Sequence, residues 1–279
     1  MRGLRLRDAG VELRIGVALL LAIIILGLVV PAFAPEDPRR WNTVPRNLAP
    51  GGDYLLGTTS QGQDVFWLLA LSVRNSLWVG FTVGVIATLF GAVVGMAAGY
   101  VGGLPDRVLT LLTDSFIVIP ALPILILFSA LLEGRASLLL VGCVLAVFNW
   151  PRPARQTRAL VLSLREREFM RTAWFAGSNT LQIIRREIAP YLTGWFIANF
   201  VYTVLIAIAT ETGLAVIGLS NLQDTTLGGM IYWALRHQAI LAERWYWIGP
   251  PTLVIIVLSV ALFVVSSGLS KLSARRRGL

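Results

Sequence analysis

The amino-acid sequence predicts an all-α polytopic membrane protein with six transmembrane helices. Its 279 residues are 56% hydrophobic and the mean hydropathy is +0.73, whereas a soluble domain is usually about 45–50% apolar. Charged residues make up only 14% of the chain, and they cluster between uncharged runs. Several of these runs approach the ~20 residues that an α-helix needs to cross about 30 Å of hydrocarbon.

The chain opens with a short basic tail and an apolar run. Residues 1–14 include several arginines, and we expect this tail to be cytoplasmic. Residues 15–34 carry no charge and are predicted to form the first transmembrane anchor. The Ala32-Phe33-Ala34 sequence resembles a signal-peptidase site, but the apolar run exceeds the roughly 7–15 residues typical of a signal peptide. We therefore expect the anchor to remain uncleaved.

A polar segment, residues 35–75, is rich in Pro and Gly and is predicted to be extracytoplasmic. Residues 76–270 follow as the predicted transmembrane core, with spans expected at residues 77–100, 108–132, 136–150, 192–218 and 248–270. Residues 136–150 are short for a span, so this helix is expected to continue past Pro151 in a kinked or tilted form. The core includes a cytoplasmic loop, residues 152–190, and a basic cytoplasmic tail follows it, residues 271–279.

The distribution of positive charge predicts the orientation. Most of the 24 Lys and Arg residues lie in residues 1–14, 152–190 and 271–279, and short segments rich in Lys and Arg remain on the cytoplasmic side. Both termini are therefore expected in the cytoplasm. The net charge of +9 is then a topology signal, and the expected partner is anionic membrane lipid rather than nucleic acid.

Small residues recur in the second expected span. Gly91, Gly95 and Gly99 are spaced by four residues, and Gly80 and Gly84 precede them at the same spacing. This spacing lets two helix backbones approach closely, and it indicates a contact face toward another helix or subunit. The alternative interpretation is the ordinary glycine content of a membrane helix.

The cytoplasmic loop contains one stretch, residues 164–191, that is polar and yet helical in pattern. Gly177 can end a first, charged helix in the left-handed conformation. Ser178 and Asn179 are suitable N-cap residues for a second helix, and Gln182 completes a loose variant of the capping box with Asn179.

This second helix has a narrow apolar face. Leu181, Ile184 and Ile188 fall at i, i+3 and i+7, the spacing of one helix face, and Pro190 is expected to end the helix. The stretch is either a solvated surface hairpin or a docking element. In the second interpretation the apolar face is exposed in the isolated chain and inserts into a groove on a soluble partner.

Two acidic residues fall well inside predicted spans. A charge in the bilayer costs at least about 2.5 kcal/mol, so Asp114 and Glu211 are expected to have a partner or a task. Asp114 lies about 10 Å past the cytoplasmic start of its span and Glu211 about 28 Å along its own, near the outer end, so we do not expect them to pair. They are candidates for the pathway or a gate; the alternative is a neutral, hydrogen-bonded acid. Pro120 and Pro123 should bend the helix that carries Asp114.

The sequence offers little for catalysis or for metal binding. Cys143 is the one cysteine and His237 the one histidine, so we expect no catalytic residue and no metal site in this chain. The only lysine, Lys271, does not belong to a G-x-x-x-x-G-K-[ST] phosphate-binding loop. If ATP drives this protein, another subunit binds it.

Several motifs together resemble the permeases of ABC importers. The cytoplasmic signature of these proteins is similar to residues 171–190, with Ala173, Gly177 and Pro190 at matching positions. Arg171, Thr172 and Ala189 stand where the family usually has Glu, Ala and Leu. Further blocks, in the family's order, are residues 56–64 (LGTTSQGQD), 74–77, 99–107, the Asp114 and Pro120 pair, 210–219 and 226–231. Thr59 and Gln63 replace the usual Asp and Arg.

The resemblance covers roughly residues 55–270 and points to the dipeptide/oligopeptide/nickel importer family, second permease type. It implies a type I ABC-importer permease fold in the inner membrane. The implied partners are a second homologous permease, two ABC ATPases and an extracytoplasmic substrate-binding protein. ATP and Mg would be bound by the ATPases, so no cofactor is expected in this chain. A peptide is the default substrate, and oligosaccharide and nickel are the alternatives.

The residue patterns and the resemblance together suggest roles for individual residues. The positions expected to couple the permease to the ATPases are Ala173, Gly177, Ser178, Leu181, Ile184, Ile188 and Pro190. The positions expected in the translocation pathway or its gate are Asp114, Pro120 and Glu211.

Two other classes of protein fit less well. A secondary transporter would require coupling carboxylates near the midplane and usually an internal repeat, and we find no repeat. An intramembrane serine protease would require a reactive Ser with a buried His, whereas His237 lies in a polar outer loop. A metalloprotease would require H-E-x-x-H, which one His does not supply. Co-purification with an ATPase would separate the importer from both the secondary transporter and the intramembrane enzymes.

Overall fold

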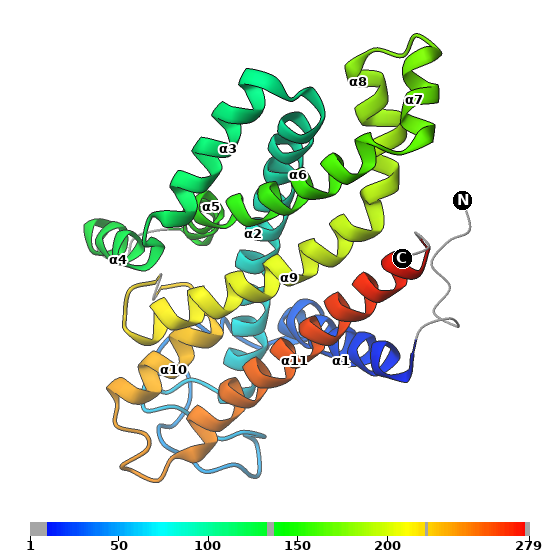
Figure 1. Cartoon of the computed structure of the whole chain (residues 1–279). Coiled ribbons are helices and arrows are strands. Elements are labelled where there is room, and N and C mark those ends of the chain that lie inside the picture. The colour runs from blue at the N-terminus through cyan, green and yellow to red at the C-terminus, as the bar shows by residue number, and fades with distance from the viewer. Residues whose placement is uncertain (1–9, 133–136, 221–222, 277–279) are drawn as a thin grey trace.

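The computed structural model describes residues 10–132, 137–220 and 223–276, and these residues form a helical protein (Figure 1). Among them the only β-structure is two isolated bridges, Gly51 with Tyr54 and Thr58 with Asp64. The predicted all-α class is confirmed.

The helices follow one another along the chain as α1 Val11–Leu28, η2 Val30–Phe33, α2 Val65–Val101, α3 Gly103–Val118, α4 Ala121–Leu132, α5 Leu138–Asn149, α6 Pro151–Arg165, α7 Glu168–Phe175, α8 Thr180–Ile183, η3 Ile184–Ile188, α9 Ala189–Val216, α10 Leu227–Arg236 and α11 Trp245–Arg276. The η2 element is a 3₁₀-helix, and η3 is a π-helical turn that joins α8 to α9.

Four helical segments of the described chain are long and apolar enough to cross a membrane. They are Val11–Phe33, Val65–Val101, Thr180–Val216 and Trp245–Leu272. A fifth candidate is the pair of α3 and α4, which is bent by 73°. The break lies at Ile119 and Pro120, where a proline was expected to bend the helix. The remaining expected span, residues 136–150, corresponds to α5, whose 12 residues are fewer than a spanning helix needs. The count of six therefore remains a prediction.

The longest helix begins earlier than expected. α2 starts at Val65 rather than at residue 77, because the Asp64 carboxylate accepts a hydrogen bond from Phe66 N at 2.8 Å and caps the helix. The last part of the polar segment 35–75 is therefore helical. Burial raises the pKa of the Asp64 carboxyl.

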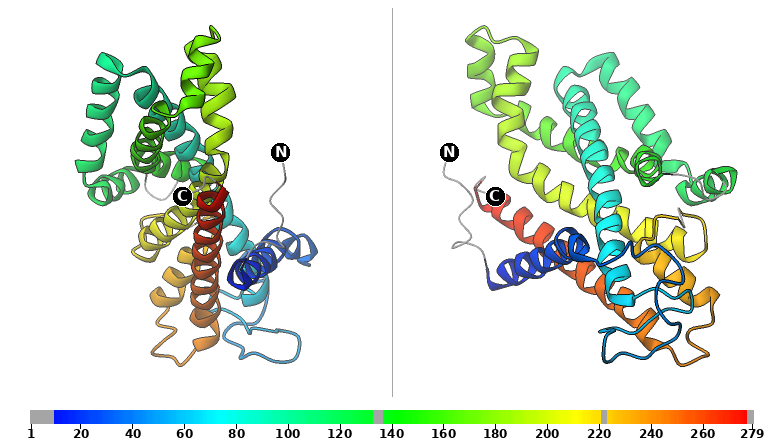
Figure 2. Two further views of the ribbon diagram at one scale, coloured as in Figure 1. Left: turned by 45° about the vertical axis from the view of Figure 1, so that its right-hand side comes forward. Right: turned by 180° about the vertical axis from the view of Figure 1, so that it is seen from behind.

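α2 organises the packing of the bundle. It contacts α1, α3, α5, α6, α9, α10 and α11, and Figure 2 shows it, in cyan, running through the middle of the molecule. Gly91, Gly95 and Gly99 face α6, and Gly80 and Gly84 face α9. A Cβ atom at Gly91 would lie 2.7 Å from the Trp150 carbonyl oxygen, so only glycine permits this approach. The predicted small-residue contact face is confirmed, and it serves helices of the same chain.

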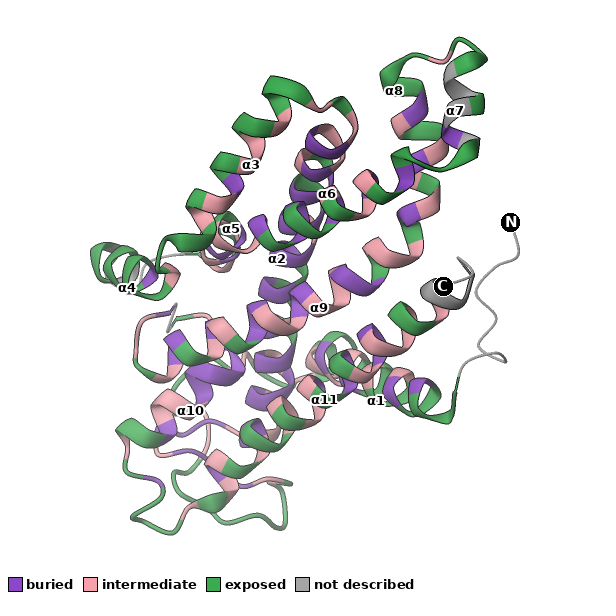
Figure 3. Ribbon diagram, viewed as in Figure 1, coloured by how far each residue is buried: buried purple, intermediate pink, exposed green. Residues whose placement is uncertain are grey.

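Two ends of the molecule are distinct (Figure 1). Residues 35–64 and α10 lie together at one end, and the α7–α8 hairpin lies at the opposite end. This separation agrees with their predicted positions on opposite sides of a membrane. Between the ends, α1 and α4 expose most of their residues (Figure 3), and these include large apolar side chains such as Leu122, Leu127 and Leu131. Such a surface fits lipid or another subunit.

Candidate functional site

The α7–α8 hairpin is the candidate coupling site, and its turn is built as the sequence predicts. Gly177 follows α7 and has φ of +77°, in the left-handed region that glycine adopts without steric cost. No atom lies within 4 Å of the position of a Cβ at Gly177. Any substitution here would therefore act through the backbone and not through a clash.

The second helix of the hairpin has the predicted capping box. Gln182 N donates to Asn179 Oδ1 at 2.9 Å, and Asn179 N donates to Gln182 Oε1 at 2.9 Å. Asn179 is thus the N-cap, and Ser178 precedes it as a half-buried residue. Ala173 belongs to α7, but its side chain, like that of Arg171, lies outside the described part of the structure.

The expected apolar docking face is wrong at one of its three positions. Leu181 is 63% exposed, but Ile184 is half-buried and Ile188 is fully buried. Ile188 packs with Ile183 and Leu192 in a small core. The reason is the π-helical turn, in which Ala189 N donates to Ile184 O, five residues back. The wider turn breaks the 3.6-residue period on which the prediction depended.

Among the hairpin side chains that the structure describes, the exposed large apolar ones are one from each helix. Phe175, at the end of α7, is 79% exposed, and Leu181 is in the first turn of α8. Beneath them the hairpin is fixed by a core of Val161, Leu164, Met170, Ile183, Ile188 and Leu192. The hairpin therefore has a packed base and an exposed apolar tip, which consists of Phe175 and Leu181.

Pro190 does not end the helix, contrary to the prediction. The chain stays helical from Thr180 to Val216, and Pro190 lies in the first turn of α9. A proline lacks the N–H that an α-helix uses, and its ring collides with the carbonyl four residues earlier. The preceding π turn changes the bonding register at this point, so the helix continues through the proline.

Asp114 lies on α3 at the edge of the bundle. Its side chain is 50% exposed, and its nearest cation is Arg155, with Nη1 3.9 Å from Oδ1. The exposure follows from the position of α3, which packs chiefly on α2 and α6. Asp114, which was expected inside a span, is thus half-exposed at the side of this chain. Pro120 follows Ile119, the C-cap of α3.

Glu211 lies in α9 and is buried. Its Oε1 accepts hydrogen bonds from Ser220 Oγ at 2.9 Å and from Thr226 Oγ1 at 2.8 Å. Its Oε2 has no hydrogen-bond partner among the described residues. Thr226 is the N-cap of α10 and accepts a hydrogen bond from Gly229 N at 3.2 Å. The acid therefore joins the end of α9 to the start of α10.

A second set of contacts joins the same region to α2. Ser76 Oγ accepts from Leu227 N at 3.0 Å, and Asn75 Nδ2 donates to Thr225 O at 2.8 Å. α9 ends in a Schellman motif at Gly218, in which Leu219 N donates to Leu214 O and Gly218 N to Ala215 O, both at 2.8 Å. The described residues on both sides of positions 221–222 are thus fixed by hydrogen bonds to α9 and α2.

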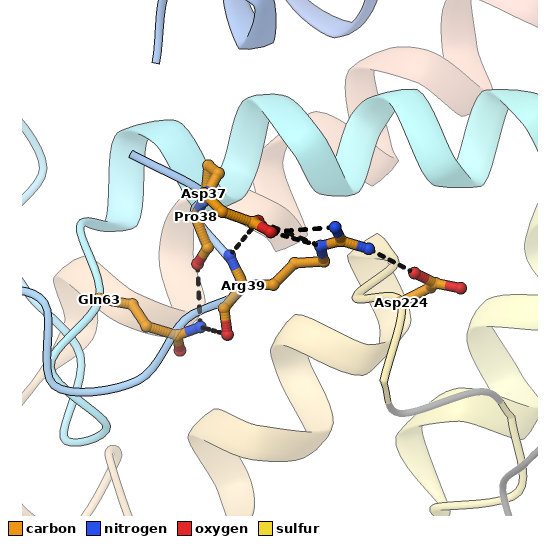
Figure 4. A network of polar contacts seen from close by, with 5 residues as sticks. All are labelled: Asp37, Pro38, Arg39, Gln63 and Asp224. Carbon is orange, nitrogen blue, oxygen red and sulfur yellow. Dashed lines mark hydrogen bonds and ion pairs between the residues drawn. The ribbon is translucent and has the colours of Figure 1, made fainter. Parts of the chain in front are cut away.

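A polar network at the same end was not predicted (Figure 4). Arg39 Nη2 lies 2.9 Å from Asp37 Oδ2, and Arg39 Nη1 lies 3.1 Å from Asp224 Oδ1. Gln63 Nε2 donates to the carbonyl oxygens of Pro38 at 3.0 Å and Arg39 at 3.2 Å. Hydrogen bonds from Arg39 hold the pKa of the Asp37 carboxyl below its usual value. The network ties residues 35–64 to the segment between α9 and α10.

A second ion pair that sequence reasoning missed connects α3 to α6. Arg158 Nε lies 2.6 Å from Asp106 Oδ1, and its Nη2 lies 2.8 Å from Oδ2. The two residues are far apart in the chain, and only the i, i+4 pairing on one helix could have been read from the sequence. The pairing of Arg39 with Asp224 was missed for the same reason, because these residues are also far apart in the sequence.

Comparison with known proteins shows to which class of membrane protein this helical bundle belongs. A family described as "Binding-protein-dependent transport system inner membrane component" matches residues 91–278. The chain belongs to this family. The matched region runs from the second half of α2 through α11 and includes the α7–α8 hairpin and Glu211.

Individual relatives of the permease extend over most of its length. The oligopeptide transport system permease protein OppC of Lactococcus lactis subsp. lactis is 30% identical over 238 residues, which cover 85% of this chain and 80% of that protein. OppC of Mycobacterium bovis is 30% identical over 252 residues, 89% of this chain and 86% of its own. OppC of Lactococcus lactis subsp. cremoris is 29% identical over 225 residues, 80% of this chain and 76% of its own.

The resemblance inferred from the motifs is confirmed by these matches. The relatives are permease subunits of transport systems and not enzymes. The permease is a multi-pass membrane protein, because the family is an inner-membrane component and several helices are long enough to span.

Proposed function

We propose that this permease forms, with a second homologous permease, the membrane pathway of an ATP-driven importer of di- and oligopeptides. The observation that carries the proposal is the similarity, at about 30% identity over most of both chains, to proteins named as oligopeptide permeases. Oligosaccharide and nickel are the alternative substrates, since permeases of the family suggested by the sequence motifs serve all three.

The proposed route of coupling uses the α7–α8 hairpin. Its apolar tip, Phe175 and Leu181, is exposed beyond a packed base, which suits insertion into a groove on a soluble partner. In the proposed assembly, two ABC ATPases dock on the hairpins of the two permeases and bind ATP and Mg. This chain binds neither.

The proposed orientation places the hairpin and both termini in the cytoplasm, in accordance with the charge distribution. Residues 35–64 and α10 then face outward, where an extracytoplasmic binding protein delivers the peptide. The fixed polar connections at this end, through Arg39 and Glu211, support a rigid surface for such a delivery.

Reconstitution in lipid vesicles tests the function. The permease, its partner permease, both ATPases and the binding protein are expected to accumulate a labelled peptide only when ATP is supplied. Uptake of an oligosaccharide or of nickel in place of peptide would select an alternative substrate. Uptake driven by an ion gradient without ATP would favour a secondary transporter.

A further inference from the structure

A hollow of about 490 Å³ lies between α3, α5, α6 and α9 and is separate from the hairpin and from the outer network. Its volume is within the range of small-ligand sites, about 300–1,000 Å³. Its lining includes the apolar side chains of Phe116, Ile119 and Phe148. It also includes four polar or charged residues, Arg152, Arg155, Gln156 and Tyr202.

The two arginines are weakly neutralised. Arg152 Nη1 donates to the Tyr202 hydroxyl oxygen at 3.1 Å, and its guanidinium carbon lies 6.0 Å from the centroid of that ring. Both contacts are with an uncharged group. Arg155 has a carboxylate 3.9 Å away, that of Asp114, and its own side chain is 69% exposed. By contrast, Arg158 on the same helix is engaged by both carboxylate oxygens of Asp106.

The position of the hollow along the bundle makes these charges informative. Tyr202 lies within the spanning segment Thr180–Val216, roughly 21 Å from its Val216 end at 1.5 Å per residue. Arg152 and Arg155 lie on α6, at the start of the segment 152–190 that was predicted to be cytoplasmic. The hollow therefore lies where a spanning helix approaches the predicted cytoplasmic side, and arginines that face a cavity at such a position are candidates for a substrate pathway.

We propose that Arg152, oriented by Tyr202 and assisted by Arg155, binds the terminal carboxylate of a peptide on its way through the permease. This inference rests on the proposed function. A guanidinium can donate two parallel hydrogen bonds to a carboxylate, and a carboxyl terminus is common to unmodified peptides of every sequence. The aromatic side chains of the lining accept peptide side chains of varied shape. The Tyr202 hydroxyl holds the guanidinium in place without cancelling its charge.

The test compares uptake of one peptide with that of its carboxyl-amidated form by the complete reconstituted transporter. The measured quantity is the uptake rate of the free peptide divided by that of the amidated peptide. Because the binding protein can itself distinguish the two peptides, this ratio for each variant is compared with the wild-type ratio, measured with the same binding protein at saturation. We expect wild type to favour the free carboxylate. We expect R152Q to lower the ratio about tenfold, which corresponds to 1.4 kcal/mol, mainly by slowing uptake of the free carboxylate.

Two further variants and one control complete the design. R152K keeps the charge but loses the bidentate fork, so an intermediate ratio is expected, and Y202F should lower the ratio less than R152Q. R107Q removes an exposed arginine of α3 that lies outside the hollow and should leave the ratio unchanged. If R152Q does not assemble, R152K and Y202F decide.

An R152Q ratio equal to the wild-type ratio, whether uptake of both peptides is unchanged or falls in proportion, would overturn the inference. Proportional loss would instead fit an arginine that pairs with the second permease. These results are distinguishable from failure of the proposed function, in which wild type takes up neither peptide with ATP.

Discussion

At the scale of single residues, Glu211 holds together three parts of the chain. Replacing it with Ala would leave the hydroxyls of Ser220 and Thr226 without their acceptor in a buried site. Each such loss costs about 1–3 kcal/mol. We therefore expect E211A to lower the melting temperature of the purified complex, as measured by thermal unfolding in detergent.

The matched variant E211Q separates stability from transport. Glutamine retains a carbonyl oxygen that can accept both hydrogen bonds, so we expect normal assembly. If Glu211 also acts in the pathway or a gate, E211Q will assemble fully and transport more slowly. Wild-type transport by E211Q would leave the acid with the structural role alone.

Asp37 gives the outer network a defined dependence on pH. Arg39 lowers the pKa of this carboxyl in the folded protein, so the pair stabilises the fold above the unfolded pKa of about 3.9. That stabilisation is lost as the pH falls through the lower, folded value. We expect D37N to increase proteolysis of residues 35–64 at pH 7, measured against wild type by a limited digest.

The control for this prediction is acid. Amide exchange of residues 35–64 in wild type and D37N should converge when the pH falls well below 3.9, because both side chains are then uncharged. A difference that persists unchanged there would show that the carboxylate charge is not the cause.

At the scale of elements, the hairpin is expected to transmit ATP hydrolysis to the permease. Leu181→Asp places a charge on the exposed tip, so the variant permease should fold normally. In the complex, the same charge would be unpaired in the apolar groove of the ATPase, which is strongly unfavourable. Truncation of an interface anchor typically costs about 2 kcal/mol, or roughly thirtyfold in affinity, and Asp should cost more. We expect L181D to lose ATPase on co-purification.

Gly177→Val and Ile184→Asp are the informative comparisons. A β-branched residue at φ +77° costs about 1–2 kcal/mol, so G177V should redirect α8 and also reduce recovery of the ATPase. Ile184 is half-buried on the hairpin core, so I184D should weaken the hairpin itself. Equal ATPase recovery with wild type, L181D and G177V would contradict the proposed coupling role.

The contact of α2 with α6 depends on glycine. At Gly95 a Cβ would meet Thr157 Cβ at 2.6 Å, and overpacking of this kind typically costs about 1–3 kcal/mol. G95A should therefore lower the yield and melting temperature of the permease. Gly213 in α9 has open space around it, so G213A is the matched control and should leave both unchanged.

The sequence predicts local features of these elements better than their orientation. The left-handed Gly177 and the Asn179–Gln182 box depend on neighbouring residues, and both are present. The burial of Ile188 was missed because a periodic pattern assumes a uniform helix, and a π turn violates that assumption. The partners of Arg39 and Arg158 were missed because tertiary packing alone brings them to their acids.

At the scale of the whole molecule, hydropathy predicted the class and four of the spans, since each is a continuous apolar run. The position of the break between α3 and α4 was indicated by Pro120 and not by hydropathy, and neither gave the 73° size of the bend. Hydropathy also did not show that the helix of residues 136–150 stops at Asn149. The exposed apolar side chains of α1 and α4 belong to surfaces that the membrane or a second subunit covers. A single chain leaves these surfaces unpartnered.

Orientation in the membrane follows from charge, and cysteine labelling tests it. In a C143S background, which removes the one native cysteine, D53C places a thiol in the exposed part of residues 35–64 and S178C places one in the hairpin. Arg and Lys concentrate at the hairpin end and in the two tails, and they are retained on the cytoplasmic side. An impermeant maleimide should therefore label D53C in sealed, right-side-out vesicles and label S178C only after permeabilisation. Labelling of S178C in sealed vesicles, with D53C protected, would invert the topology and would remove the hairpin from the reach of any cytoplasmic ATPase.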